Sequence, residues 1–190
     1  MKSLALFDFD GTLYKKDSLL EVTKFIAGRK KFWTGMALLS PYLVALKLGL
    51  LHNAKVKTKY LTHFFKGMDH DAFKTAAGTF ALQQIDKNLN PVLKAALANH
   101  LANGDDVYIV TASFTEWLLP WCELNNVKLI SSKLEIKSGS ITGKITDLNC
   151  YGPEKIVQIR KAINLDNYDA IEVYGNGKGD AEMLMLKRLK

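Results

Sequence analysis

Two aspartates stand two residues apart directly after a short apolar run near the start of the chain. The run over 3–9 predicts a buried strand, with Asp8 and Asp10 at its carboxyl end. Residues i and i+2 of an extended chain point the same way, so both carboxylates should enter one crevice, where Gly11 lets the backbone turn sharply beside a ligand. A helix cap would explain only one of the two acids. Because close carboxylates repel each other and hard oxygen ligands suit Mg2+, the pattern predicts a magnesium site.

The string Asp8-Phe9-Asp10-Gly11-Thr12 resembles the first signature of the haloacid dehalogenase-like (HAD) superfamily of phosphohydrolases, which carries three further signatures in fixed order. The second is a Ser or Thr at the end of the next core strand, and Thr111 ends the apolar, β-branched run over 106–111. Thr111-Ala112-Ser113 is similar to the phosphoserine-phosphatase-like branch of that superfamily. Ser113 or Thr115 could also cap the following helix, and both interpretations can hold together.

The third signature is a lysine near the start of a later helix. Lys155 follows Gly152 in a Gly-x-x-Lys arrangement, and Pro153 predicts the first turn of a helix. A lone lysine in a lysine-rich chain is usually solvated surface, so the order of the signatures and the local context are what select Lys155.

The fourth signature should follow the strand predicted over 170–174. Asp180 matches the second acid of the family pattern Gly-Asp-x-x-x-Asp, but Asn176 stands where the first acid, a metal ligand, would be. An amide oxygen can coordinate Mg2+ without bringing charge, which predicts weaker metal binding or activity and leaves a degenerate site open. The glycines of this segment match neither a dinucleotide fingerprint nor a P-loop.

The resemblance implies a Mg2+-dependent phosphatase that acts on a small phosphorylated substrate. It assigns Asp8 as the nucleophile that forms an aspartyl-phosphate, Asp10 as the acid and base, and Thr111 and Lys155 as the phosphate cradle. It places the metal between Asp8, the Asp10 carbonyl and the Asn176/Asp180 loop. Three alternatives stay open: a membrane-associated lipid-phosphate phosphatase, a phosphotransferase, and a phosphate-binding protein without catalysis.

Strands that alternate with helices predict an α/β fold with a doubly wound parallel sheet, whose ligand lies beyond the carboxyl ends of the strands. The catalytic core is expected over 1–13 and 89–190, with an all-helical cap inserted at 14–88. Core strands are predicted at 3–9, 106–111, 127–131 and 170–174, a hairpin at 134–146, and helices at 91–103, at 114–124, from Pro153 and after Asp180.

The cap should begin with a helix whose N-cap is Ser18. Ser18 and Glu21 have the spacing of a capping box, and Gly28 is expected to close the helix. Asp17 stands where phosphoserine phosphatases carry a substrate-binding Glu, although a charge at a helix start explains it equally well.

The apolar segment 32–51 has one charged residue, Lys47, and its apolar residues surround the helix. Gly35, Ser40, Pro41 and Gly49 predict two short helices packed inside the cap, the interpretation that we favour. An interfacial membrane anchor flanked by lysines is the alternative, and a bilayer span is a third. The segment is similar in character to the apolar insertion of bacterial phosphatidylglycerophosphatase C, a HAD relative that acts on a lipid phosphate.

The chain has 190 residues and a formal net charge of +7, enough length for one core with an insertion. The charge is carried mostly by lysine in short clusters, which predicts a solvated surface and no nucleic-acid partner. Cys122 and Cys150 lack metal or disulfide spacing, and residues 1–8 are too short for a signal peptide, so a cytoplasmic location is expected, with membrane-surface contact through 32–51 as the alternative. Nothing in the sequence indicates an oligomeric state.

Overall fold

A five-stranded sheet with the order β4-β3-β2-β1-β5 forms the centre of the computed structural model, which describes residues 2–146 and 149–188. The parallel strands are β1 (Ser3–Phe7), β2 (Asp106–Phe114), β3 (Lys128–Lys137) and β5 (Ala170–Tyr174). Strand β4 (Ser140–Thr146) pairs antiparallel with the second half of β3, as in the predicted hairpin, but the strand predicted over 127–131 and the first arm of the hairpin form one continuous strand. The predicted parallel α/β core is confirmed, with β1 ending just before Asp8.

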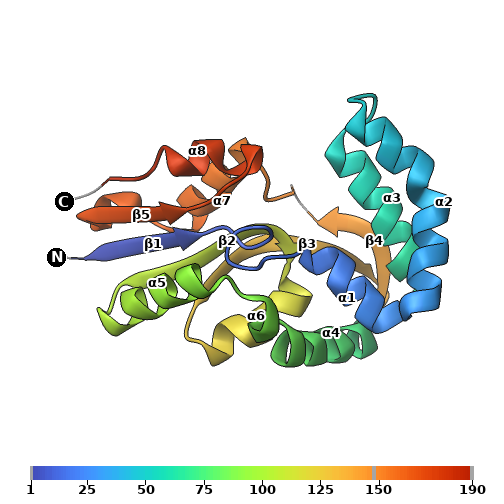
Figure 1. Ribbon diagram of the computed structural model, residues 1–190, viewed down its shortest axis with the longest axis horizontal. Coiled ribbons are helices and arrows are strands. Elements are labelled where there is room, and N and C mark those ends of the chain that lie inside the picture. The colour runs from blue at the N-terminus through green and yellow to red at the C-terminus, as the bar shows by residue number, and fades with distance from the viewer. Residues whose placement is uncertain (1, 147–148, 189–190) are drawn as a thin grey trace.

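Helices cover both faces of this sheet (Figure 1). One face carries α5 (Pro91–Ala102) and α6 (Thr115–Leu124), and the other carries α7 (Pro153–Ala162) and α8 (Ala181–Leu184). Because successive side chains of a strand point to opposite faces, β1 supplies Phe7 to the first apolar cluster and Leu6 to the second. Three short 3-10 turns, at Asp86–Asn88, Leu165–Asn167 and Lys178–Asp180, complete the described elements of this core.

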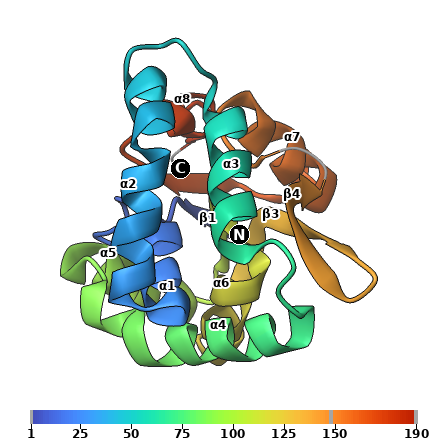
Figure 2. The same cartoon turned by 90° about the vertical axis from the view of Figure 1, so that its right-hand side faces the viewer.

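The chain between β1 and α5 is helical, as predicted for 14–88. It forms α1 (Ser18–Ala27), α2 (Arg29–Lys47), α3 (Asn53–Phe65) and α4 (His70–Gln84). Figure 2 shows α2 and α3 as an antiparallel pair in front of the sheet, with α1 and α4 at the base. Where the chain leaves and re-enters the core, Lys15 donates to the Asn88 carbonyl and Asn90 to the Leu13 carbonyl, so the two connections lie side by side. The boundaries at 13/14 and 88/89 stay a prediction.

The prediction of two short helices within 32–51 is wrong. Helix α2 runs without interruption from Arg29 to Lys47, with Pro41 inside it. A proline removes the hydrogen bond to the carbonyl four residues earlier, here that of Ala37. The Ser40 hydroxyl donates to this carbonyl at 2.8 Å and so replaces the missing donor. None of the helices within 2–146 and 149–188 combines the length and hydropathy that crossing a bilayer requires.

The start of α1 also differs from the prediction by one residue. Asp17, and not Ser18, is the N-cap, and its carboxylate accepts from the Leu20 amide at 3.0 Å. Ser18 is the first residue of the helix and is fully buried. Gly28 closes the helix at φ +79°, as predicted, a backbone conformation that glycine adopts at no steric cost because it has no Cβ.

Candidate active site

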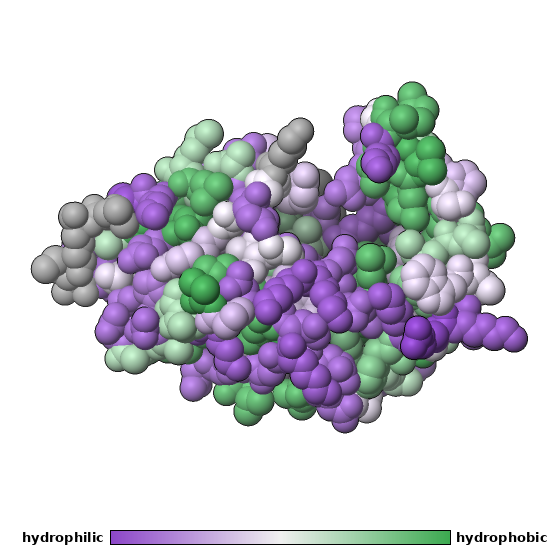
Figure 3. Space-filling view, in the orientation of Figure 1, coloured by the Kyte–Doolittle hydropathy of each residue, from purple (hydrophilic) through white to green (hydrophobic). Residues whose placement is uncertain are grey.

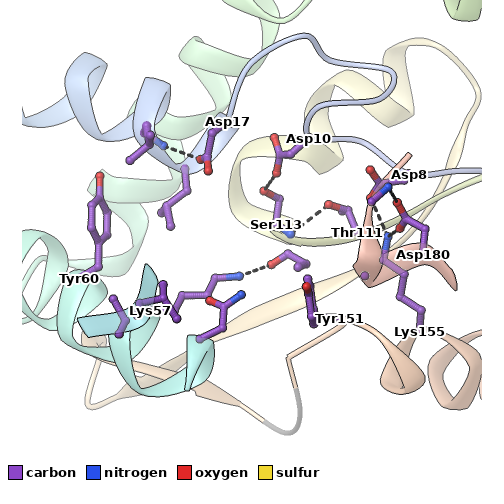
Figure 4. Close-up of a pocket in the computed structure, with 18 of the residues that line it drawn as sticks. Asp8, Asp10, Asp17, Lys57, Tyr60, Thr111, Ser113, Tyr151, Lys155 and Asp180 are labelled. Carbon is purple, nitrogen blue, oxygen red and sulfur yellow. Dashed lines mark hydrogen bonds and ion pairs between the residues drawn. The ribbon is translucent and has the colours of Figure 1, made fainter. Parts of the chain in front are cut away.

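The carboxyl edge of the sheet faces a cavity of about 440 Å3 whose far wall is formed by α1, α2 and α3. Figure 4 shows the groups that line it: Asp8, Lys155 and Asp180 on one side, Asp10, Thr111 and Ser113 in the middle, and Asp17, Lys57 and Tyr60 on the side of the inserted helices. Every residue that the sequence predicted for catalysis or metal binding lines this cavity: Asp8, Asp10, Thr111, Lys155, Asn176 and Asp180.

Asp8 is held through both of its carboxylate oxygens. Lys155 Nζ donates to Asp8 Oδ1 at 2.6 Å, and Thr12 Oγ1 donates to Asp8 Oδ2 at 2.8 Å. The same Nζ donates to Asp180 Oδ1 at 2.6 Å. Burial by itself lowers the pKa of Lys155, but the two carboxylates overcome it and raise the pKa above its ordinary value. The buried ammonium therefore stays charged and fixes two carboxylates at one point.

Asp10 lies beside this cluster in a set of hydroxyl and amide donors. Its Oδ1 accepts from the Ser18 amide at 2.7 Å, and its Oδ2 accepts from the hydroxyls of Ser18 and Ser113. The Trp117 indole donates in turn to the Ser18 hydroxyl at 3.0 Å. Burial raises the pKa of Asp10 to about 7, the carboxylate of Asp17 adds to this, and the hydroxyl donors oppose it. This carboxyl can thus gain and lose a proton near neutral pH.

An irregularity in β2 aims its side chains at the cavity. The register with β3 shifts between Thr111 and Phe114, and a bulge of this kind turns neighbouring side chains away from the regular pleat. The buried Thr111 hydroxyl accepts from the Ser113 amide at 3.0 Å. Neither Ser113 nor Thr115 caps α6, contrary to one interpretation of the sequence, because Phe114 is the N-cap residue and Thr115 bonds to Ser131 instead.

The loop after β5 is held by hydrogen bonds to Asp180, the second acid of the fourth signature. The Asn176 and Gly177 amides donate to Asp180 Oδ2 at 3.2 Å and 3.0 Å. The side-chain amide of Asn176 donates to the Gly11 carbonyl, which joins the fourth signature to the first. This contact is available to an amide and not to an aspartate, which has no side-chain donor.

These residues fit a magnesium ion with two charged ligands. Among the described residues, no three Asp, Glu, His or Cys side chains gather as a metal site. Asp8 and Asp180 nevertheless face one point, and the Asn176 side chain, which lines the same cavity, carries an amide oxygen of the hard kind that suits Mg2+. With Lys155 charged, the two carboxylates keep one net negative charge for a cation.

Lys57 of α3 reaches from the inserted helices to the sheet. Its Nζ donates to the Ala112 carbonyl and, at 2.9 Å, to Asn149 Oδ1, and it lies 4.6 Å from the centre of the Phe114 ring. Burial lowers the pKa of Lys57 to about 8, against the attraction of Asp10 and Asp17. A second cation, half-buried, therefore lines the cavity.

The sequence analysis assigned no active-site role to four of these residues: Thr12, Ser18, Ser113 and Lys57. Thr12 and Ser113 stand inside the first and second signatures, so their hydroxyl side chains at these positions could have indicated a place in the site. Ser18 had been assigned to a capping box, and Lys57 is one of three lysines at alternate positions of one helix. Only the fold shows which of those three lines the cavity.

The family comparison agrees with this geometry. The family model of haloacid dehalogenase-like hydrolases matches residues 5–185. The chain belongs to this family. Protein CicA of Caulobacter vibrioides is 32% identical to it over 186 residues, which cover 96% of this chain and 82% of that protein.

Solved structures share the fold of this HAD-like hydrolase at low sequence identity. A protein of unknown function from Bordetella pertussis Tohama I has a TM-score of 0.77 and 21% identity, covering 91% of this chain and 81% of its own. A substrate-bound phosphoserine phosphatase has a TM-score of 0.70 and 16% identity, covering 100% of this chain and 85% of its own. The predicted phosphoserine-phosphatase-like form of the HAD fold is therefore confirmed.

Proposed function

We propose that this HAD-like hydrolase cleaves a phosphate monoester through an aspartyl-phosphate formed on Asp8, with Mg2+ as its cofactor. The observation that carries the proposal is the meeting of Asp8, Lys155 and Asp180 at one edge of the sheet, with Asp10 in the same cavity. Family membership supports a hydrolytic reaction.

Asp8 acts as the nucleophile in the first step. One of its oxygens attacks phosphorus, the bond from phosphorus to the ester oxygen breaks, and Asp10 gives its proton to the leaving alcohol. In the second step a water attacks the same phosphorus and gives its proton to Asp10. The bond from phosphorus to Asp8 breaks, which releases inorganic phosphate and restores both side chains.

The surroundings of each aspartate suit its step. The contacts of Asp8 with Lys155 and Thr12 hold its carboxylate in place, which lowers the entropy cost of attack. Asp10 is oriented by Ser18 and Ser113, and its raised pKa allows it to carry a proton in both directions.

The cavity also supplies positive charge and donors for the phosphoryl oxygens. When bound, Mg2+ offsets the charge of those oxygens, and Asp8, Asp180, Asn176 and the Asp10 carbonyl would hold it. Lys155 adds a fixed cation, and the Thr111 hydroxyl a hydrogen-bond donor. Lys57 adds a second cation on the side of the inserted helices.

The test is to trap the intermediate. Enzyme turning over a soluble aryl phosphate with Mg2+ is quenched in acid and reduced with borohydride, which converts an aspartyl-phosphate to homoserine. The tryptic peptide 3–15 contains both Asp8 and Asp10, and fragment masses identify which one is reduced. We expect homoserine at position 8 in the wild type and none in Asp8→Asn.

The outcomes separate the proposed hydrolase from a phosphotransferase and from a phosphate-binding protein without catalysis. Inorganic phosphate equal to the ester consumed indicates a hydrolase, whereas a deficit that an added alcohol increases indicates a phosphotransferase. No Mg2+-dependent loss of any ester, together with no homoserine, would indicate a phosphate-binding protein and overturn the proposal.

A further inference from the structure

The net positive charge of the chain is concentrated on one element, the α2–α3 hairpin, residues 29–66. This hairpin contains eight Lys and Arg residues and no Asp or Glu, out of 26 basic and 19 acidic residues in the whole chain. The remaining residues therefore include 18 basic and 19 acidic side chains and are almost neutral. The charge of +7 is thus a property of the hairpin and not of the surface in general.

The outward face of α2 is apolar along most of its length. No charged residue stands between Lys31 and Lys47, a stretch of roughly 20 Å at the rise of an α-helix. Phe32, Gly35 and Leu39 pack inward. Large apolar side chains on the outward face and at the turn to α3 are exposed: Trp33 by 60%, Leu38 by 68%, Val44 by 57%, Leu48 by 67% and Leu50 by 73%. The prediction that the segment 32–51 packs inside the cap is therefore wrong for the outward face of α2.

The exposed apolar groups gather at the free end of the hairpin. Figure 3 shows hydrophobic side chains, in green, over the end of the α2–α3 pair that projects farthest from the sheet. Lys47 and Lys55 stand on either side of this end, and Arg29, Lys30 and Lys31 begin α2 at the other end; all five are exposed. A helix with an apolar outer face framed by lysines has the pattern of an element that lies in a bilayer interface.

The inner side of the same hairpin lines the cavity. Its contributions there are mostly apolar: Met36, Leu43, Leu46, Val56 and Tyr60, with Asn53 and Lys57 as the polar exceptions. Leu46 and Asn53 flank the exposed turn, so the lining extends from the catalytic edge to the free end of the hairpin. A substrate with a long apolar group would bury that group along this wall, whereas a short charged alcohol would meet few partners.

We infer that the α2–α3 hairpin docks on an anionic bilayer surface, and that the substrate is the phosphate monoester of an amphiphile held in that bilayer. The substrate part of this inference rests on the proposed phosphatase function, whereas the docking part does not. The lysines attract the anionic headgroups, and Trp33, Leu48 and Leu50 enter the headgroup region.

Two other occupants of this face fit the observations less well. A second copy of the chain would bring two hairpins of the same strong positive charge together, which like-charge repulsion opposes. A nucleic acid would satisfy the lysines but would leave the aliphatic side chains of Leu38, Val44 and Leu48 without an apolar partner.

Binding is tested by co-sedimentation with vesicles of phosphatidylcholine alone and of phosphatidylcholine with phosphatidylglycerol. We expect binding to the anionic vesicles, weaker at high salt, and a loss of at least about tenfold in affinity for the double variant Leu48→Asp/Leu50→Asp. The matched control is Leu82→Asp/Val92→Asp, which changes a Leu and a Val exposed by 53% and 74% on α4 and α5 and should bind as the wild type does. Thermal melts must show that both variants are folded.

Two further measurements identify the residues that contact the bilayer. Because Trp117 and Trp121 are buried, vesicle-induced changes in tryptophan fluorescence report on Trp33, and Trp33→Phe should remove them. Replacing Lys47 and Lys55 by Gln should weaken binding to anionic vesicles, whereas Lys94→Gln/Lys161→Gln should not.

Activity on a soluble ester and on a bilayer-bound ester separates membrane docking from catalysis. Leu48→Asp/Leu50→Asp should hydrolyse a soluble aryl phosphate as the wild type does, but lose at least about tenfold on a diacylglycerol phosphate in anionic vesicles. Binding without hydrolysis of either ester would overturn the proposed phosphatase and leave the docking intact. Hydrolysis of the soluble ester without vesicle binding would overturn the docking, as would a wild-type dimer that Leu48→Asp/Leu50→Asp dissociates.

Discussion

Carboxylates and lysines meet at both edges of the parallel sheet, but in opposite surroundings. At the carboxyl edge, Asp8 and Asp180 share the single ammonium of Lys155, and all three side chains are buried. At the amino edge, Asp106 contacts Lys2 at 3.0 Å, Lys128, and the Tyr168 hydroxyl at 2.7 Å. The Lys2 and Lys128 side chains are 58% and 55% exposed.

The two edges differ in the balance of charge and burial, and not in residue type, between the candidate catalytic cluster and a surface ion-pair cluster. At the amino edge one carboxylate has two lysines and a hydroxyl, which outweigh its desolvation and hold the pKa of Asp106 far below its usual range. At the carboxyl edge one lysine pairs with two carboxylates, so this buried cluster keeps a net negative charge. Such an excess is unfavourable in the folded protein until a cation joins it.

Asp8→Asn should break the carboxyl-edge cluster with the largest effect on activity. An amide is a far poorer nucleophile than a carboxylate, so we expect kcat to fall by on the order of 10^4-fold or more. The free energy of unfolding in metal-free buffer should stay within about 1 kcal/mol of the wild type, because the remaining Asp180 still pairs with Lys155. The measurements are turnover of a soluble phosphomonoester and urea unfolding. Wild-type activity in this variant would exclude the covalent mechanism.

Lys155→Met should damage both stability and activity. It leaves two adjacent buried carboxylates without a cation, which costs about 3 kcal/mol of unfolding free energy, and it lowers kcat by roughly 10^2-fold or more. Mg2+ should raise the melting temperature of this variant more than that of the wild type, since the ion replaces the missing charge. Lys161→Met, on the exposed side of the same helix, is the control. Equal responses to Mg2+ in both variants would show that Lys155 does not share a site with the metal.

Asn176→Asp should strengthen metal binding at the carboxyl-edge cluster. It adds a third carboxylate, so we expect Mg2+ to bind about tenfold more tightly in a calorimetric titration. In metal-free buffer the variant should be less stable, because it adds charge to an already negative cluster and removes the donor to the Gly11 carbonyl. Unchanged or weaker affinity would place Asn176 outside the ligand set.

Asp106→Asn applies the same substitution at the amino edge and should have the smallest effect. We expect a loss of about 1 kcal/mol in unfolding free energy near neutral pH and no change in kcat. Because folding lowers the pKa of Asp106, its contribution is complete above the ordinary value of about 3.9 and is lost as the pH falls through the lower folded value. The difference from the wild type should therefore shrink in acid. A constant difference between neutral and acid pH would show that charge is not the cause.

Most of the core and the carboxyl-edge residues could be predicted because their signals are local. The strand over 170–174, the helix starting at Pro153 and the closing Gly28 depend on periodicity and backbone preferences within a few residues. The elements of the inserted part were less predictable at their ends. Helix α2 continues through Pro41, where the Ser40 hydroxyl bonds the carbonyl that the proline leaves free, and Asp17 rather than Ser18 is the N-cap of α1.

The candidate site residues and their order could be predicted from the sequence, since Asp8, Asp10, Lys155 and Asp180 each stand close to the end or start of an element whose pattern is local, and Thr111 lies in the last part of β2. The tertiary structure alone decided which other residues join them. Ser113 is 103 positions from Asp10, and Lys57 is 92 positions from Asn149, so these contacts exist only after the sheet and the inserted helices are assembled. It also decided that one side of α2 lines the cavity while the other is exposed. The apolar residues of α2 surround the helix, so the sequence does not specify which side faces inward. The packing of α2 against α1 and α3 fixes this rotation.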